Sequence, residues 1–349
     1  MKSKILRKAQ KKEIMFKKYN SIENTYREKA TAQVYLHDYG NEKFIVQEKV
    51  HGANFSFITD GTQIQVAKRT SLIVEGENFN NYKYVLHKYE KAIIELFKLV
   101  KKDFPETEMI TVFGEIFGGN YPHPTLNKID GMVRIQKGVF YSPENDFYAF
   151  DICLDHKQYL DVTIANTYFE KVGMFYAKTL FEGSFSECMA YPNTFESKVH
   201  EWLNLPKIED NICEGTIIKP LMSKRFGNGQ RVIFKNKNEK WSEKSHVKRS
   251  QVSKPSATEI LSDTEKELMN TLLGYVNENR LMNVQSKLGE FSPKQTGKTI
   301  GLLAKDALED FVKDHETDWE NTEKQHQKVM TKILNKEAAT VVKEVLLFK

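Results

Sequence analysis

Residues 48–55 read Glu-Lys-Val-His-Gly-Ala-Asn-Phe, and they join two segments that have the pattern of β-strands. Residues 44–46 are apolar, and residues 55–57 alternate apolar and polar side chains. Gly52 allows a sharp turn between the two segments. Lys49 therefore stands at a strand-turn, followed by a histidine and an asparagine, and this arrangement indicates a nucleophilic amine. A lysine at the end of a strand is more often a solvated surface charge, so the octapeptide alone leaves both interpretations open.

Five further segments carry the charged and aromatic residues that a lysine attacking a nucleotide would need. In chain order they are Ala67-Lys68-Arg69-Thr70, Phe113-Gly114-Glu115, Phe147-Tyr148-Ala149-Phe150-Asp151-Ile152, Glu214-Gly215-Thr216-Ile217-Ile218-Lys219-Pro220 and Phe234-Lys235-Asn236-Lys237. Together with residues 48–55 they resemble, in order and spacing, the six motifs of covalent nucleotidyltransferases, which include ATP-dependent RNA and DNA ligases and mRNA capping enzymes. The continuation His-Gly-x-Asn-Phe is similar to the RNA ligase 2 branch, that of bacteriophage RNA ligase 2 and the trypanosome RNA-editing ligases. The resemblance covers roughly residues 15–315.

Two lysines in the last segment have the spacing that the chemistry of Lys49 requires. Attack on a phosphate needs an unprotonated amine, whereas a free lysine has a pKa near ~10.4. Neighbouring cations can lower that pKa. Lys235 and Lys237 are two residues apart, so on a strand both side chains project from the same face and can reach one phosphate chain. The alternative is a solvated polar face on an edge strand.

The resemblance implies a role for each matching residue. It makes Lys49 the carrier of a covalent AMP derived from ATP, with Lys235 and Lys237 at the phosphates. It implies that His51 serves the RNA steps after adenylation and that Asn54 assists at the phosphates or at a metal-bound water. The residues expected to bind the nucleotide are Ile22, Glu48, Lys49, Val50, Asn54, Arg69, Glu115, Phe150, Lys219, Lys235 and Lys237.

Further expectations from the resemblance concern the metal and the RNA. Glu214 is expected either to bind Mg²⁺ or Mn²⁺ or to position the lysine. Arg280, Asp306 and Asp310 resemble positions that RNA ligase 2 enzymes use to engage a nicked duplex. An arginine at the end of a helix and a pair of carboxylates four residues apart are also commonly just solvated, so this second interpretation stays open.

Composition limits the class of protein. The chain has 349 residues, of which 40% are hydrophobic, so it can bury a large core and form two domains. A net charge of +5 permits a polyanionic partner. Three separated cysteines argue against a disulfide framework or structural zinc and fit a reducing compartment. No apolar run approaches the ~20 residues of a membrane span. We therefore expect an intracellular protein, with the cytoplasm favoured.

The hydrophobic pattern predicts an α+β fold in two domains. Residues 15–243 carry strand signals that suit a nucleotidyltransferase domain of antiparallel sheets with flanking helices, including one clear helix between Val85 and Val100. A polar linker follows at 244–258. Residues 259–349 have helical spacing and no five-strand pattern, so we expect a small all-helical domain in place of the OB-fold that DNA ligases and capping enzymes carry. Residues 1–14 form a basic extension, which leaves a mitochondrial location open.

The prediction for function is an ATP-dependent RNA ligase. It would seal 3′-OH and 5′-phosphate RNA ends, at nicks in duplex RNA, through a lysine–AMP intermediate and an adenylated RNA 5′ end, working as a monomer. The alternatives are a DNA ligase or capping-type nucleotidyltransferase with the same nucleophile, and a duplex-RNA binding protein without activity. The lack of an OB-fold pattern and the His51–Asn54 spacing argue against the first. The intact lysine and final motif argue against the second.

Overall fold

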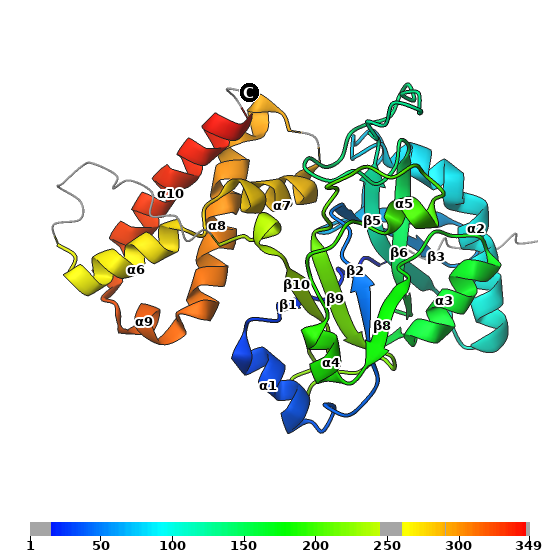
Figure 1. The fold of residues 1–349 in the computed structure, drawn as a ribbon, viewed down its shortest axis with the longest axis horizontal. Coiled ribbons are helices and arrows are strands. Elements are labelled where there is room, and N and C mark those ends of the chain that lie inside the picture. The colour runs from blue at the N-terminus through cyan, green and yellow to red at the C-terminus, as the bar shows by residue number, and fades with distance from the viewer. Residues whose placement is uncertain (1–14, 245–259, 290, 347–349) are drawn as a thin grey trace, which may run out of the picture.

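The computed structural model describes residues 15–244, 260–289 and 291–346. In this range an α+β region built on two sheets is followed along the chain by a group of helices (Figure 1). The basic extension predicted at 1–14, and the predicted linker apart from Lys244, lie outside the described residues. None of the helices in the described ranges has the length and apolar character needed to cross a membrane.

The first sheet has five strands in the order β1-β10-β9-β2-β8. They are β1 (Glu23–Asn24), β2 (Phe44–Glu48), β8 (Thr179–Gly183), β9 (Gly215–Pro220) and β10 (Phe234–Lys237). Neighbouring strands are antiparallel except β1 and β10, which are parallel. The register places Glu48 opposite Thr216 and Lys237 opposite Gly215. The end of β2, the start of β9 and the end of β10 therefore lie side by side.

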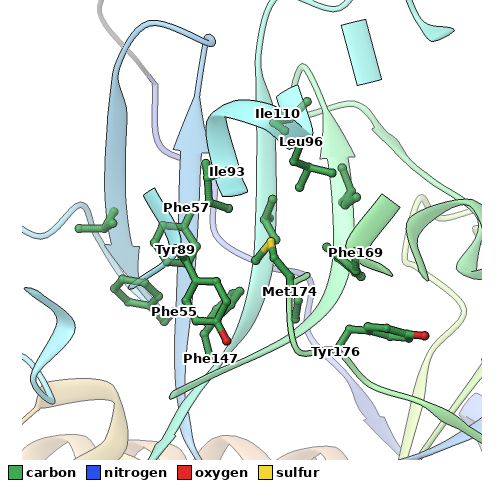
Figure 2. Close-up of a cluster of buried hydrophobic side chains, with 14 of the residues drawn as sticks. Phe55, Phe57, Tyr89, Ile93, Leu96, Ile110, Phe147, Phe169, Met174 and Tyr176 are labelled. Atoms are coloured by element: carbon green, nitrogen blue, oxygen red, sulfur yellow. The ribbon is translucent and has the colours of Figure 1, made fainter. Parts of the chain in front are cut away.

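The second sheet is antiparallel throughout, in the order β4-β3-β5-β6-β7. Its strands are β3 (Ala53–Thr59), β4 (Ile64–Lys68), β5 (Ile110–Gly118), β6 (Asn145–Leu154) and β7 (Gln158–Tyr159). Helices α2 (Tyr82–Asp103) and α3 (Val162–Lys171) pack on it and close a core that contains Phe57, Tyr89 and Phe147 (Figure 2). The turn at residues 49–52 leads from β2 in one sheet to β3 in the other. Lys49 consequently lies where the two sheets meet.

Short helices complete this region. Helices α1 (Glu28–Leu36) and α4 (Phe185–Ala190) contribute Val34 and Phe185 to a second apolar cluster on the first sheet. Helix α5 (Val199–Trp202) and the 3₁₀ turn η1 (Glu239–Trp241) contribute to a third cluster, around Tyr141 and Tyr148. Within the described residues the last strand, β10, leads directly into η1, so the lysines of β10 and Trp241 are held on consecutive elements.

The carboxy-terminal elements are helical. They are α6 (Asp263–Leu273), α7 (Glu278–Leu288), η3 (Pro293–Gln295), α8 (Thr296–Asp314), α9 (Glu316–Asn321) and α10 (Lys324–Leu346). Ser262 and Glu265 form a capping box that satisfies backbone N–H groups at the start of α6. The apolar faces of these helices share one cluster that includes Leu272, Leu303 and Leu334. Residues 260–289 and 291–346 contain no strand, which agrees with the prediction that this region is not an OB-fold.

The predicted α+β class, the antiparallel sheets and the helical carboxy-terminal region are confirmed. Two local expectations were wrong. Residues 231–234 have a strand pattern in the sequence, but strand β10 begins only at Phe234. Arg280 stands in the first turn of α7 and not at the end of a helix. Gly52 lies in the connection between β2 and β3 without positive φ. A Cβ there would lie 2.8 Å from both Glu115 Cβ and the Ile116 oxygen, so glycine is needed for close approach.

Candidate active site

Fourteen of the sixteen predicted site residues line one cavity of about 640 Å³. Its walls come from both sheets, from the amino-terminal segment before β1 and from α7 and α8. The predicted residues on it are Ile22, Glu48, Lys49, Val50, His51, Asn54, Arg69, Glu115, Phe150, Lys219, Lys235, Lys237, Asp306 and Asp310. The remaining two, Glu214 and Arg280, lie behind this wall. The folding of the chain thus gathers segments more than 280 residues apart around Lys49.

Lys49 is held by the two strands that flank it. Its backbone N–H donates to the Gly215 oxygen at 2.9 Å, which extends the pairing of β2 with β9 by one residue. Its ammonium group lies 2.6 Å from Glu214 Oε2, and 19% of its side chain is exposed, on the cavity side. Lys49 therefore has a fixed base and an accessible amine, and the solvated-charge interpretation is wrong.

Glu214 is the buried carboxylate at the centre of this arrangement. Lys237 Nζ lies 2.7 Å from its Oε1, and His51 Nδ1 lies 3.3 Å from the oxygen that also meets Lys49. Burial alone would raise the pKa of Glu214, but Lys237 and Lys49 hold it well below its usual value. Of the two roles expected for Glu214, this arrangement has the form of the lysine-positioning one. Metal binding at Glu214 stays a prediction.

Lys235 and Lys237 both face the cavity, as their spacing predicts. Strand β10 lies between β1 and β9, so the alternative of a solvated edge strand is wrong. Burial lowers the pKa of Lys235, against the opposing charge of Glu243. Burial would also lower the pKa of Lys237, but Glu214 and Glu243 raise it above its usual value. One lysine is thus tightly paired, while the other is more readily neutralised.

Other residues expected to hold the nucleotide line the same cavity as Lys235 and Lys237. Glu115 accepts a hydrogen bond from the Asn54 side chain, and burial raises the pKa of Glu115 to about 7 although Lys49 opposes the shift. Arg69 donates to the backbone carbonyl oxygen of Tyr19 at 2.6 Å, which fixes the Arg69 guanidinium beside the amino-terminal segment. Phe150 is held edge-on by Tyr19, with ring centroids 5.1 Å apart. An aromatic face, a carboxyl and a guanidinium therefore meet on one side of Lys49.

Two of the predicted nucleotide contacts already have partners within the protein. Glu48 accepts hydrogen bonds from Ser197 Oγ at 2.6 Å and from the Lys198 backbone at 2.7 Å, and burial raises its pKa to about 7. Lys219 donates to the Phe150 oxygen at 2.9 Å and lies 3.1 Å from Asp151. Direct contact of their side chains with a nucleotide stays a prediction. The bonds of Glu48 fix the end of β2, and those of Lys219 tie β9 to β6.

Arg280 does not reach the cavity. It is 1% exposed and lies 2.7 Å from Asp306 and 2.9 Å from Asp310, with Glu243 at 3.6 Å. The expectation that these groups could be simply solvated is wrong for Arg280. Asp306 and Asp310 do line the cavity, and with Glu243 they offer three oxygens within 4.8 Å of one another. Arg280 neutralises this acidic group, so its predicted contact with RNA would require a different arrangement.

Comparisons with known proteins identify the family. The family model described as RNA ligase matches residues 42–237, more than half of the chain. The chain belongs to the RNA ligase family. A second model, described as the carboxy-terminal domain of T4 RNA ligase 2, matches residues 258–340. The chain is therefore an ATP-dependent RNA ligase of the RNA ligase 2 branch, and the predicted family and enzyme class are confirmed over the two alternatives.

Individual relatives of this RNA ligase are moderately similar. It is 28% identical to "RNA-editing ligase 2, mitochondrial" of Trypanosoma brucei brucei over 356 residues, covering 86% of this chain and 84% of the relative. It is 27% identical to "RNA-editing ligase 1, mitochondrial" over 335 residues, covering 78% and 71%. A solved structure of a Naegleria gruberi RNA ligase variant with ATP and Mn has a TM-score of 0.41 at 17% identity, covering 65% of this chain and 57% of that one.

The cavity of the RNA ligase also contains residues that the sequence did not predict. Glu243 lies 2.5 Å from Lys237 and 4.0 Å from Lys235, so it joins the charged group around the amine. The helical side adds Asn283, Ser286, Lys287, Leu302, Lys305, Glu309 and Lys313. Glu243 follows Lys237 by six residues in a polar segment without periodicity, and the helical residues belong to an amphipathic pattern that does not reveal their partner. Spacing from the last motif was the only available signal for Glu243.

Proposed function

We propose that this RNA ligase joins a 3′-OH to a 5′-phosphate at nicks in duplex RNA, with Lys49 as the covalent carrier of AMP. The observation that carries the proposal is the position of the Lys49 amine. It lies on the wall of a single cavity, between the two cations of β10 and the aromatic and carboxyl groups of the second sheet. An amine in this setting has a phosphate-binding surface on one side and a base-binding surface on the other.

In the first step Lys49 Nζ releases a proton to solvent in the cavity and, as a neutral amine, attacks the α-phosphorus of ATP, losing a second proton as the new bond forms. A phosphorus–nitrogen bond forms, the bond from the α-phosphorus to the bridging oxygen breaks, and pyrophosphate leaves with the electron pair. Lys235 and Lys237 neutralise the charge that builds up on the phosphate oxygens, which is the main contribution a protein makes to phosphoryl-group chemistry. The adenylated Lys49 has lost its positive charge, so Glu214 then keeps Lys237 as its charged partner.

The two RNA steps use the same cavity. An oxygen of the RNA 5′-phosphate attacks the AMP phosphorus, the phosphorus–nitrogen bond breaks and Lys49 is regenerated. The RNA 3′-OH then attacks the phosphorus of the adenylated 5′ end, and AMP leaves with the bridging oxygen. We assign His51 to these steps because its side chain lines the cavity, two residues from Lys49 and against the same carboxylate.

The nucleotide fits the walls by type of contact. Phe150 offers a ring for adenine to stack on, with Ile22 and Val50 as apolar neighbours on the cavity. Arg69 and Glu115 face the side where the ribose and its phosphate would lie. A carboxyl with a pKa of about 7, such as that of Glu115, can donate or accept a hydrogen bond near neutral pH.

A divalent metal accompanies ATP in this family, and the cavity contains suitable oxygen donors. Mg²⁺ is usually held by substrate phosphates together with one or two carboxylates. Asp306 and Asp310 line the cavity, whereas Glu214 lies behind its wall. All three carboxylates are paired with cations: Glu214 with Lys49 and Lys237, and the two aspartates with Arg280, Lys287 and Arg27. ATP-bound Mg²⁺ or Mn²⁺ would therefore have to replace one of these cations, and we expect it to do so at Asp306 or Asp310, which line the cavity. When bound, the metal neutralises charge on the leaving pyrophosphate. Glu214 becomes available as a ligand only after adenylation has discharged Lys49.

The duplex is proposed to bind across the sheets and the helical region. Lys287, Lys305 and Lys313 lie on the α7 and α8 side of the cavity, opposite the wall that carries Arg69. Phosphates of a nicked duplex could contact both sides at once. We propose boundaries near residues 15–243 and 259–349 for the two units, a monomer as the active form, and a mitochondrial location as the alternative to the cytoplasm, since two relatives are named mitochondrial.

A panel of nicked duplexes tests this function. Purified protein is incubated with ATP and Mg²⁺ on nicks whose 3′-OH and 5′-phosphate strands are RNA or DNA in each combination, and on single-stranded RNA with the same ends. The proposal requires fastest sealing of the nicks with RNA at the 3′-OH and much slower joining of single strands. Equal or faster joining of unbridged RNA ends, or sealing confined to all-DNA nicks, would contradict it.

A further inference from the structure

Glu243 places a carboxylate against the two lysines of β10 that face the cavity. Its Oε1 lies 2.5 Å from Lys237 Nζ and 4.0 Å from Lys235 Nζ, and all three side chains line the cavity. A carboxylate oxygen and a phosphate oxygen are both anionic acceptors of hydrogen bonds from an ammonium group. Glu243 therefore occupies, with an oxygen of the protein itself, a position from which these lysines would contact a phosphate.

Lys237 does not depend on Glu243 for its position. Its Nζ also lies 2.7 Å from Oε1 of Glu214, a fully buried carboxylate behind the cavity wall. Its backbone belongs to β10, which is paired with β9 on one side and with β1 on the other. Lys237 thus keeps a counter-charge and a fixed base if the Glu243 carboxylate moves away. The contact with Glu243 can therefore be exchanged for a contact with a substrate anion.

Glu243 is placed so that its side chain can move aside. It lies outside the helices and strands, two residues after η1, so a change of its rotamer breaks no bond of a helix or a sheet. Its Oε2 lies 3.6 Å from Arg280, which leaves a cation beside the carboxylate after it has left Lys237. Burial alone would raise the pKa of Glu243, but Lys237 and Lys235 hold it well below its usual value. A triphosphate entering the cavity therefore meets a negative charge that it can displace.

We propose that Glu243 is an internal competitor for the phosphate site of Lys235 and Lys237. It fills the site in the empty enzyme, is displaced by the phosphates of ATP, and returns when pyrophosphate leaves. The inference rests on the proposed function, in that it takes the two lysines to bind the phosphates of ATP and Lys49 to receive AMP. Displacement costs the same free energy for each ligand that needs the site. Glu243 therefore raises the ATP concentration that adenylation needs, and the pyrophosphate concentration that its reversal needs, by one common factor.

Such a competitor acts on the release of the product. In the reverse reaction an oxygen of pyrophosphate attacks the phosphorus of lysine–AMP, the phosphorus–nitrogen bond breaks, ATP is formed again, and the Lys49 nitrogen regains its protons from solvent. A carboxylate that returns to Lys237 compensates its charge once pyrophosphate has left. Pyrophosphate then rebinds less readily, so lysine–AMP persists for longer.

The test compares two ligands of the full-length protein at a fixed concentration of Mg²⁺. Lysine–AMP formation is followed in a single turnover at increasing ATP, and loss of label from purified lysine–AMP is followed at increasing pyrophosphate. In Glu243→Gln both half-saturating concentrations should fall by the same factor of about 5- to 20-fold, because the amide offers Lys237 a neutral hydrogen bond that is weaker than the charge-assisted one. The maximal rates should change far less, since Glu243 has left the site before the chemistry starts.

Two further variants separate displacement from a general effect of charge. Glu243→Asp keeps the charge but is one methylene shorter, so it loses the contact with Lys237 and should lower both concentrations as Glu243→Gln does. Glu239→Gln removes an exposed charge of η1, away from the residues that line the cavity, and should leave both concentrations unchanged. Adenosine, which has no phosphate, should inhibit adenylation of all these proteins at the same concentration.

Variants of the lysines keep a failure of the proposed function apart from a failure of the competition. If Lys235→Ala and Lys237→Ala need no more ATP than the unchanged protein, the lysines do not bind phosphate and the proposed function fails at this point. If they need far more ATP while Glu243→Gln and Glu243→Asp match the unchanged protein, only the competition is overturned.

Three other results would also overturn the competition. A higher ATP requirement in Glu243→Gln would mean that Glu243 helps the lysines to bind ATP. A fall for ATP without an equal fall for pyrophosphate would mean that the two ligands do not displace the same group. A fall in Glu243→Gln with none in Glu243→Asp would mean a general effect of charge. Glu243→Asp decides the question if Glu243→Gln does not fold.

Discussion

Glu214 is fully buried, and Lys49, His51 and Lys237 all contact its carboxylate. A buried charge is tolerated when it is paired and costly when it is alone. In the proposed reaction Lys49 loses its charge on adenylation, so the first step would change how well Glu214 is compensated. At the residue scale, the site is therefore an arrangement of charges in which adenylation of Lys49 would alter the partners of one carboxylate. Glu48, one residue before Lys49, shows the opposite case of a buried carboxyl without a cation against it.

Glu48 gives a prediction for stability against pH. Burial raises its pKa to about 7 from a usual value of 4.5. The folded state therefore holds a proton that the unfolded chain loses first, so Glu48 reduces stability as pH rises from ~4.5 through ~7, by roughly 3 kcal/mol in total. In Glu48→Gln the amide oxygen can still accept from the Lys198 N–H and the NH₂ can donate to Ser197, so this fall should disappear.

The measurement is urea unfolding of both proteins at pH 5 and pH 8. The free energy of unfolding should fall more between these values in the unchanged protein than in Glu48→Gln, and the comparison cancels groups common to both. Equal changes with pH in the two proteins would show that Glu48 does not titrate in this range.

At the scale of elements, one buried group ties the first sheet to the second. Asp151 on β6 lies 2.6 Å from Arg231, in the segment before β10, and 3.1 Å from Lys219 on β9. Tyr19 also donates to its carboxylate, which fixes the amino-terminal segment that carries Ile22. These contacts hold the strands whose ends form the cavity. They explain why Asp151, in the same motif as Phe150, has a structural role here.

Asp151→Asn should destabilise this arrangement strongly. The amide keeps the volume but removes the charge, which leaves two buried cations without a counter-charge, at a cost of about 3–5 kcal/mol. Urea unfolding followed by circular dichroism measures the change, with the exposed Asp130→Asn as the matched control. A loss below about 1 kcal/mol, the size of a surface effect, would mean that Arg231 and Lys219 are solvated in solution.

Elements with a strong local period could be predicted from the sequence, and those without one could not. Val85, Tyr89 and Ile93 mark α2 because they recur at helical spacing, and the serine–glutamate pair before α6 marks its start. Helix α7 was missed because few apolar side chains interrupt its polar sequence. Its start depends on Asn277, whose side chain accepts from the Arg280 N–H. Strand β1 has only two residues and forms through pairing with β10, more than 200 residues away.

For the molecule as a whole, the motifs identified which residues gather but not how the helical region meets them. Lys49, Glu115 and Lys237 could be assigned to one site because their motifs occur in order. The contacts of Arg27 with Asp310 at 3.0 Å and Asp314 at 2.9 Å join residues more than 280 positions apart, and a single sequence carries no signal for such pairs. Polar contacts cross this boundary, among them those of Arg27 with Asp310 and Asp314 and that of Asn279 with the Ser242 oxygen.

Removal of the helical region is therefore expected to separate adenylation from sealing. A protein truncated after Glu243 keeps all six motifs and should fold. The truncation removes the partners of Arg27 and Glu243 in the helical region, and water can then solvate these two charges. It should form lysine–AMP but seal nicks far more slowly. Binding of the full-length protein to a nick should weaken by roughly 0.7 to 0.9 log units per neutralised phosphate for each tenfold increase in salt. If the truncated protein seals nicked RNA as fast as the full chain, the helical region does not clamp the substrate.

The most direct test of the account is the fate of labelled AMP in Lys49→Ala. The unchanged protein, incubated with α-labelled ATP and Mg²⁺ and separated on a denaturing gel, should carry label that acid releases and alkali does not, as expected for a phosphorus–nitrogen bond. Lys49→Ala should carry none, and should still seal a nick whose 5′ end was adenylated beforehand, because the other groups of the cavity remain in place. Label that persists on Lys49→Ala would show that another residue is the nucleophile, and would contradict the central claim.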